Sequence, residues 1–193
     1  MNRVDGLRLD GLTVLLADGS KFTRKLVAQM LAEFGVTTIL EAEDGDAALE
    51  ALKRGPVDLL VCDTLLEKQD GIALTRSIRH EASASYRAIP ILLLAGHTRR
   101  ADVIRMRDCG ASLILAKPVA PKALYDRLAW MARDPRPFVD SPIYSGPDRR
   151  HREDEPPNGL SRRQVDRDRY ATLTDSAVTP AEIAAILAQA DSL

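Results

Sequence analysis

The stretch DLLVCDTLLEKQDG, residues 58–71, decides the fold of this chain. Residues 59–62 are apolar without interruption, which is typical of a parallel strand that is buried on both faces. Asp63 follows this run directly and precedes a loop, so helix capping explains it poorly. The stretch therefore predicts a buried strand that carries a carboxylate at its carboxyl end.

Four further runs in the first part of the chain have the character of strands, and segments with helical spacing separate them. These runs cover residues 13–17, 37–41, 91–95 and 113–116. Helices are predicted to fill the other gaps, around residues 46–53, 72–80, 99–108 and 121–131. Five strands and five helices in strict alternation indicate a doubly wound α/β domain with three layers.

The first helix is predicted between the runs at residues 13–17 and 37–41. Ser20 suits its N-cap, and Gly35 suits the position just after its end. Apolar side chains recur there every four residues, at Phe22, Leu26, Met30 and Phe34. This spacing predicts an apolar stripe that packs on the sheet.

The carboxyl ends of parallel strands meet at one edge of a sheet, where open α/β sheets bind their ligands. The residues at these ends are Asp18, Asp63, Ala95 and Lys117. Two carboxylates and one ammonium group at one edge suit a hard divalent cation and a phosphoryl group. The alternative is that strand-end aspartates only cap the next helix or turn, and it is weaker for Asp63 because a loop follows.

Residues 58–71 and three other stretches resemble the receiver domain of bacterial response regulators, the CheY-like family. The other stretches are LTVLLADGSKFTRKLV (12–27), IPILLLAG (89–96) and GASLILAKP (110–118). The resemblance implies a flavodoxin-like three-layer α/β/α fold, with five parallel strands in the order 2-1-3-4-5.

The same resemblance implies roles for individual residues. Asp63 takes the position of the phosphoacceptor, and Lys117 that of the lysine that bonds the phosphoryl oxygen. Asp18, Asp63 and the backbone carbonyl of Leu65 take the positions that hold Mg²⁺. Lys117-Pro118 resembles the family's Lys-Pro pair, whose peptide bond is typically cis.

Several positions depart from the family's pattern. Gly19 stands where a second acidic residue is expected, so Mg²⁺ binding should be weaker. Ala95 replaces the Thr or Ser that bonds the phosphoryl group, and Ile114 replaces a switching aromatic residue. Glu67 could replace the lost ligand, although a solvated glutamate is the commoner case for a loop. The apolar Leu65 could slow hydrolysis by excluding water.

Six of the 11 prolines lie within residues 135–157, a stretch that should hold neither a helix nor a central strand. We therefore predict a receiver domain over residues 1–133 and a proline- and arginine-rich linker or arm over residues 134–178. A capping-box pattern followed by apolar residues at helical spacing predicts a short helix over residues 179–193.

The arginine-rich segment has two interpretations. Interleaved acidic residues favour a self-neutralising linker or a protein-docking arm. Nine arginines and no lysine within residues 133–169 favour a nucleotide site, because the planar guanidinium pairs with phosphate and guanine and stacks on rings. The segment also resembles the arginine-rich extensions of CheY-like proteins that bind cyclic di-guanylate. This second interpretation assigns the nucleotide to Arg136, Tyr144, Asp148, Arg149, Arg150 and Arg152.

Composition excludes several classes of protein. The 27 basic residues against 28 acidic ones argue against a DNA-coating protein, and 4% aromatic residues argue against a base-stacking platform. Two scattered cysteines do not make a disulfide scaffold or a zinc site. With no long apolar run and no recognisable DNA-binding domain, we expect a cytoplasmic signalling protein rather than an enzyme.

The resemblance also implies the partners. One is a sensor histidine kinase or a phosphotransfer protein, and another is a downstream protein that binds the face of the fourth and fifth helices. Two functions stay open. The chain either accepts a phosphoryl group on Asp63, or acts as a pseudo-receiver whose arginine-rich segment binds cyclic di-guanylate or a partner protein.

Overall fold

Short apolar runs form the five strands of one parallel sheet in the computed structural model of the protein, which describes residues 9–81, 85–96, 99–134 and 136–149. The strands lie in the order β2-β1-β3-β4-β5, and each neighbouring pair is parallel. Their bounds are Thr13–Ala17 (β1), Thr38–Ala42 (β2), Leu59–Asp63 (β3), Ile91–Ala95 (β4) and Leu113–Ala116 (β5). The predicted fold class and strand order are confirmed.

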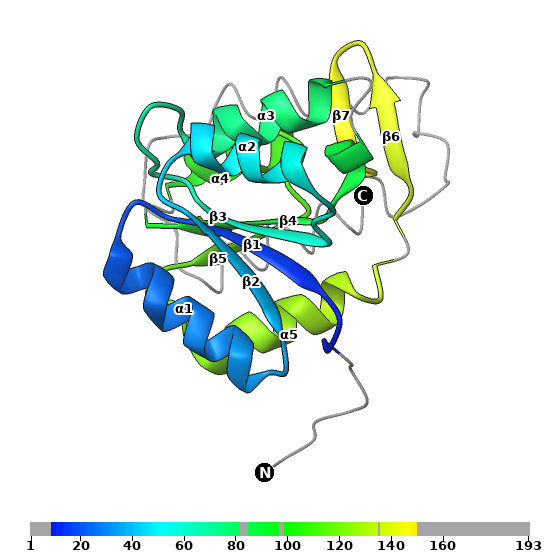
Figure 1. The fold of residues 1–193 in the computed structure, drawn as a ribbon. Coiled ribbons are helices and arrows are strands. Elements are labelled where there is room, and N and C mark those ends of the chain that lie inside the picture. Colours follow the sequence, from blue (N-terminus) through cyan, green and yellow to red (C-terminus); the bar gives the residue numbers. More distant parts are fainter. Residues whose placement is uncertain (1–8, 82–84, 97–98, 135, 150–193) are drawn as a thin grey trace.

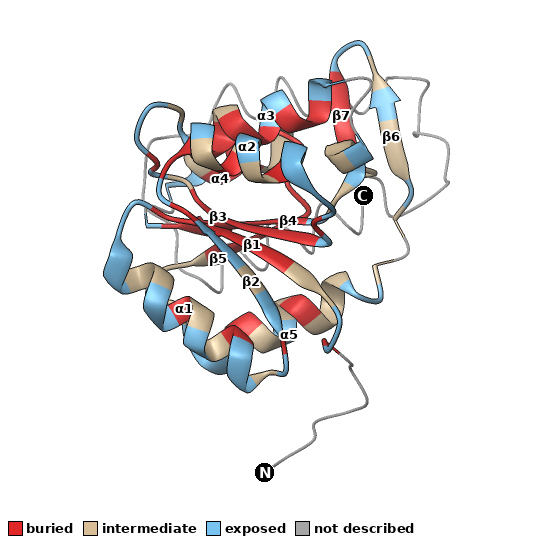
Figure 2. Cartoon of the chain, in the orientation of Figure 1, coloured by how far each residue is buried: buried red, intermediate tan, exposed pale blue. Residues whose placement is uncertain are grey.

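Five helices cover the two faces of this sheet (Figure 1). One face carries α1 (Lys21–Glu33) and α5 (Pro121–Met131), and the other carries α2 (Gly45–Arg54), α3 (Gly71–His80) and α4 (Arg100–Asp108). A short 3₁₀ helix, Ser85–Ala88, precedes β4. Because successive strand residues point to opposite faces, each face has its own apolar core. Figure 2 shows the central strands buried between these cores and the edge strand β2 largely exposed.

The apolar stripe predicted for α1 is correct at Met30 and Phe34, which pack against the core, and wrong at Phe22 and Leu26, which are exposed. The fully buried residues of this helix are Val27 and Leu31, whereas 78% of Phe22 is exposed. A step of four residues turns a helix by about 40° more than one full turn, so a stripe with this spacing winds away from the sheet. The predicted caps are correct, since Ser20 Oγ accepts from the Thr23 N–H and Gly35 has a φ of +100°.

An antiparallel hairpin follows the receiver-like part of the chain, within the segment expected to be a linker or arm. Its strands are β6 (Phe138–Ser141) and β7 (Tyr144–Pro147). Of the prolines in this stretch, Pro137 precedes β6, Pro142 lies in the turn and Pro147 ends β7, positions that a two-stranded hairpin tolerates. Residue 135, residues 150–178 of that segment and the predicted helix over residues 179–193 lie outside the described residues.

The hairpin packs on the last turn of α3 and on the turn before β5 (Figures 1 and 2). Ser145 Oγ donates to the backbone carbonyl of Arg79 at 2.9 Å, and Arg79 Nε donates to the carbonyl of Gly110 at 2.9 Å. Arg79 is 1% exposed, and its guanidinium lies 5.6 Å from the centre of the Phe138 ring. A Cβ on Gly146 would lie 2.8 Å from Gly110 Cα, so two glycines allow the two backbones to touch.

No helix in the described ranges is long and apolar enough to cross a membrane.

The close approach of the hairpin predicts that Gly110→Ala destabilises the protein. Gly110 has a φ of +94°, and a Cβ there would lie 2.9 Å from Arg79 Cγ and closer still to the Ser145 carbonyl oxygen. We expect the free energy of unfolding to fall by about 2 kcal/mol. For a chain of this size, Tm then falls by about 4–8 °C in a thermal melt.

Gly55→Ala is the matched control, because Gly55 has an extended backbone with no atom within 4 Å of an added Cβ. We expect a change within about 0.5 kcal/mol for this variant. Equal losses in the two variants would contradict the packing of the hairpin described above.

Candidate functional site

Three charged residues converge at the carboxyl edge of the sheet. Asp18 follows β1, Asp63 ends β3, and Lys117 follows β5. Lys117 Nζ lies 2.7 Å from Asp18 Oδ2 and 2.8 Å from Asp63 Oδ2. The structure therefore brings together the two carboxylates and the ammonium group that the sequence placed at neighbouring strand ends.

Both carboxylates are buried. Asp18 is 0% exposed and Asp63 6% exposed. Burial alone would lower the pKa of Lys117, but its hydrogen bonds to Asp18 and Asp63 outweigh this effect and raise the pKa. Lys117 therefore stays protonated and balances two carboxylates that would otherwise repel each other.

One oxygen of this site has no partner of its own. Asp63 Oδ1 is buried and makes no hydrogen bond with any part of the chain that the structure describes. By contrast, Asp18 Oδ1 accepts from the Ser20 N–H at 2.8 Å. A buried oxygen without a donor is costly unless a ligand satisfies it, so Asp63 Oδ1 marks the place where an electrophile or a cation can bind.

Arg24 and Gly71 shape the site but do not belong to its group of two carboxylates and one lysine. Arg24 was not predicted as a site residue from the sequence. Arg24 Nη1 donates to the Asp18 carbonyl at 2.6 Å, and its Nε pairs with Glu41 on β2 at 3.1 Å. A Cβ on Gly71 would collide with the carbonyl oxygen of Asp63. Asp18 precedes α1 and Arg24 lies in its first turn, so only their closeness in sequence could have indicated this contact.

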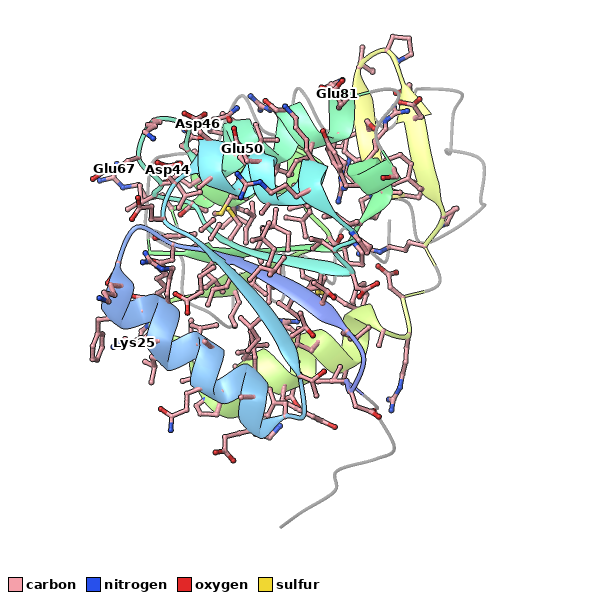
Figure 3. The ribbon with its side chains drawn as sticks, viewed as in Figure 1. Lys25, Asp44, Asp46, Glu50, Glu67 and Glu81 are labelled. Atoms are coloured by element: carbon pink, nitrogen blue, oxygen red, sulfur yellow. The ribbon has the colours of Figure 1, made fainter. Side chains whose placement is uncertain are left out.

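The loop between β3 and α3 is tied to the start of α2. Glu67 pairs with Asp44 in a backbone bridge, and Lys68 Nζ lies 2.6 Å from Asp44 Oδ2. Lys68 has a φ of +63°, a conformation that non-glycine residues seldom adopt. Figure 3 shows Glu67 beside Asp44 at the rim near α2. The side chain of Leu65 is 61% exposed, and its carbonyl belongs to the same loop.

The structure shows what surrounds the three positions that depart from the family's pattern, Gly19, Ala95 and Ile114. An added Cβ at Gly19 would meet only the Glu43 carbonyl oxygen, at 3.8 Å, so the position has room for a side chain. Ala95 and Ile114 are buried in the core beneath α2, α3 and α4. No hydroxyl or aromatic group is available at these last two positions.

The residues assigned to a nucleotide are engaged in packing where the structure describes them. Tyr144 is buried, and Arg149 lies over its ring at 3.8 Å while pairing with Asp108 at the end of α4. Arg136 pairs with Asp134 at 2.7 Å and lies 4.7 Å from the Trp130 ring centre. The Asp148 N–H donates to the Pro137 carbonyl. Arg150 and Arg152 lie outside the described residues, so the nucleotide assignment stays a prediction.

Cys62, the neighbour of Asp63, contributes no nucleophile. Burial, and then the negative charge of Asp63, raise the pKa of its thiol far above neutrality. The thiol stays protonated and donates to the Asp63 carbonyl at 3.2 Å. Cys62 therefore supplies no thiolate beside Asp63.

A five-stranded doubly wound sheet with two carboxylates and a lysine at its carboxyl edge is the arrangement of a signalling receiver domain. The family model of the response regulator receiver domain matches residues 14–129. The chain belongs to this family, whose members work in phosphorelay signalling. The Lys117–Pro118 peptide bond is cis, as the resemblance implied.

The chain is similar to chemotaxis proteins over the same region. It is 28% identical to chemotaxis protein CheY-3 of Vibrio cholerae over 117 residues, which are 61% of this chain and 88% of that protein. It is 27% identical to chemotaxis protein CheY of Pseudomonas aeruginosa over 117 residues, 61% of this chain and 93% of that protein. The structure of Vibrio cholerae CheY4 matches with a TM-score of 0.56 and 26% identity, over 61% of this chain and 96% of that one.

The charge balance of the site predicts that Lys117→Met destabilises the protein. Without the ammonium group, the buried carboxylates of Asp18 and Asp63 face each other uncompensated. We expect the free energy of unfolding, measured in urea, to fall by about 2 kcal/mol, because Lys117 is only partly buried. Adding Asp63→Asn should restore part of this loss, since one of the two negative charges is then gone.

Lys25→Met is the matched control, because Lys25 is an exposed lysine on α1 (Figure 3). We expect a change within about 0.5 kcal/mol for this variant. A Lys117→Met variant as stable as Lys25→Met would show that Lys117 does not balance the two carboxylates.

Proposed function

We propose that this protein is a response regulator that accepts a phosphoryl group on Asp63. The observation that carries the proposal is the geometry of the Asp63 carboxylate. Its Oδ2 is held by Lys117 at 2.8 Å, while its buried Oδ1 has no partner among the described residues. One oxygen is thereby oriented and the other is left to react.

The proposed step transfers a phosphoryl group from a phosphorylated histidine. An oxygen of the Asp63 carboxylate forms a bond to phosphorus while the bond from phosphorus to the imidazole nitrogen breaks. The electron pair of that bond stays on the imidazole nitrogen, and the product is an acyl phosphate on Asp63. Lys117 bonds a phosphoryl oxygen and offsets charge that develops in the transition state, where positioning and electrostatics supply most of the catalysis.

The donor atoms present fit a Mg²⁺ ion. Asp63 Oδ1 is a buried oxygen without a hydrogen-bond partner among the described residues, Asp18 is a second buried carboxylate, and the family resemblance assigns a third ligand to the Leu65 carbonyl. Hard cations prefer such oxygen ligands, and Mg²⁺ would supply neutralising charge for the phosphoryl oxygens. Gly19 leaves this set one carboxylate short of the family's pattern, so we expect weak binding.

We propose a histidine kinase or a phosphotransfer protein as the phosphoryl donor, and a protein that binds α4 and α5 as the downstream partner. Family membership and the similarity to chemotaxis proteins support this proposal. Exposed cationic residues on α4, Arg100 and Arg105, offer charge for such a contact. The protein acts in this proposal by docking, not as an enzyme that turns over a substrate.

The proposal predicts that the protein gains the mass of one phosphoryl group when it is incubated with phosphoramidate and Mg²⁺. Asp63→Asn should gain no mass, because an amide is a much weaker nucleophile than a carboxylate. Intact-mass spectrometry measures both. Absence of a mass gain in the wild type, or an equal gain in Asp63→Asn, would overturn the proposed function.

The open space at residue 19 predicts that Gly19→Asp strengthens Mg²⁺ binding. The new carboxylate can be placed without a clash, since an added Cβ meets only one atom, at 3.8 Å. We expect the Mg²⁺ concentration for half-maximal phosphorylation to fall about tenfold, because affinity for hard cations rises with the number of charged ligands. Gly19→Asn is the control, with a similar shape and no added charge, and an equal effect of both variants would contradict the role of charge.

A further inference from the structure

The inference concerns the donors for a phosphoryl group on Asp63, and it rests on the proposed function. An acyl phosphate presents three terminal oxygens that carry negative charge. Lys117 can donate to one of them, but Ala95, on the adjacent strand β4, has no donor in its side chain. A charged oxygen in a partly buried site is costly without a hydrogen bond, so another donor is needed nearby.

Thr64 lies next to Ala95 along the paired strands. In the parallel register of β3 and β4, Asp63 is opposite Leu94. The next backbone hydrogen bond of this pairing runs from the Thr64 N–H to the Leu94 carbonyl at 3.0 Å. One residue further along each of the two paired segments, Thr64 and Ala95 are therefore neighbours. Residues in register in a parallel pair point to the same face of the sheet, so a hydroxyl on Thr64 serves the same region as one on residue 95.

The present hydrogen bond of the Thr64 hydroxyl is long and redundant. Oγ1 lies 3.3 Å from the Leu94 carbonyl oxygen, which the Thr64 N–H already engages. Rotation of the side chain away from Leu94 would therefore leave that carbonyl paired. Thr64 is also half-buried rather than enclosed, so rotation about χ1 between staggered positions needs no movement of the core.

We propose that the Thr64 hydroxyl donates to the phosphoryl group on Asp63 and replaces the donor that Ala95 lacks. The hydroxyl exchanges a weak bond to a neutral carbonyl for a charge-assisted bond to a phosphoryl oxygen, which is the stronger of the two. Because charge builds on these oxygens during transfer, this bond speeds phosphorylation. In this proposal, the hydroxyl at this end of the sheet comes from Thr64, the residue after the phosphoacceptor, and not from residue 95 on β4.

The test compares initial rates of phosphorylation by phosphoramidate and Mg²⁺ in the full chain, followed by intact mass. Thr64→Val keeps the shape of the side chain and removes the hydroxyl, and we expect the rate to fall about tenfold. Thr64→Ser keeps the hydroxyl and should stay within about twofold of the wild type. Thermal melts of the same variants show that they are folded.

A double variant with the hydroxyl on β4 distinguishes a hydrogen bond to the phosphoryl group from a purely structural role of Thr64. In Thr64→Val combined with Ala95→Ser, the donor returns on β4, and we expect most of the lost rate to be restored. A wild-type rate in Thr64→Val, an equal loss in Thr64→Ser, or no recovery in the double variant would overturn the inference while leaving Asp63 as the phosphoacceptor. Absence of phosphorylation in the wild type would overturn the proposed function, and this inference with it.

Discussion

The contact of one ammonium group with two buried carboxylates is the constraint on which the rest of this molecule depends. Lys117 reaches Asp18 and Asp63 only because β5, β1 and β3 end at the same edge of a parallel sheet. Two carboxylates at this depth would repel each other strongly without a cation between them. The order of the strands, the apolar runs that bury them and the charge of the site are therefore parts of a single arrangement.

The site keeps the two carboxylates and the lysine expected of a receiver domain, and it lacks the hydroxyl and the aromatic ring expected to report a reaction. Asp63 and Lys117 sit at the ends of strands held by two cores, which gives them fixed positions. Relative to the family's pattern, Gly19 lacks a carboxylate and Ala95 a hydroxyl at this edge, and Ile114 lacks an aromatic ring within β5. The proposed function is compatible with these changes, because phosphoryl acceptance depends on the nucleophile and on local charge. The chain would have to transmit the event by other contacts.

Much of the fold could be predicted because buried parallel strands are continuous apolar runs, and β1, β4 and β5 have the predicted bounds. Convergence of Asp18, Asp63 and Lys117 followed from topology. The predicted stripe on α1 was wrong at Phe22 and Leu26, because their spacing fits a helix but places them off the face that meets the sheet. The hairpin could not be predicted, since four-residue strands bounded by proline carry no periodic pattern. Its formation depends on packing against Arg79 and Gly110, residues distant in sequence.

The hairpin and Asp63 lie at opposite ends of the domain. Asp63 lies at the carboxyl ends of the strands, whereas β7 packs against the turn before β5 and the end of α3, at the amino ends (Figure 1). Arg149, the last residue that the structure describes, is fixed there by Asp108 and the Tyr144 ring. Arg149 is therefore held at the end of the domain opposite Asp63. Within the described residues, α4 connects these two regions, because it follows β4 at the carboxyl edge of the sheet and ends at Asp108, the partner of Arg149.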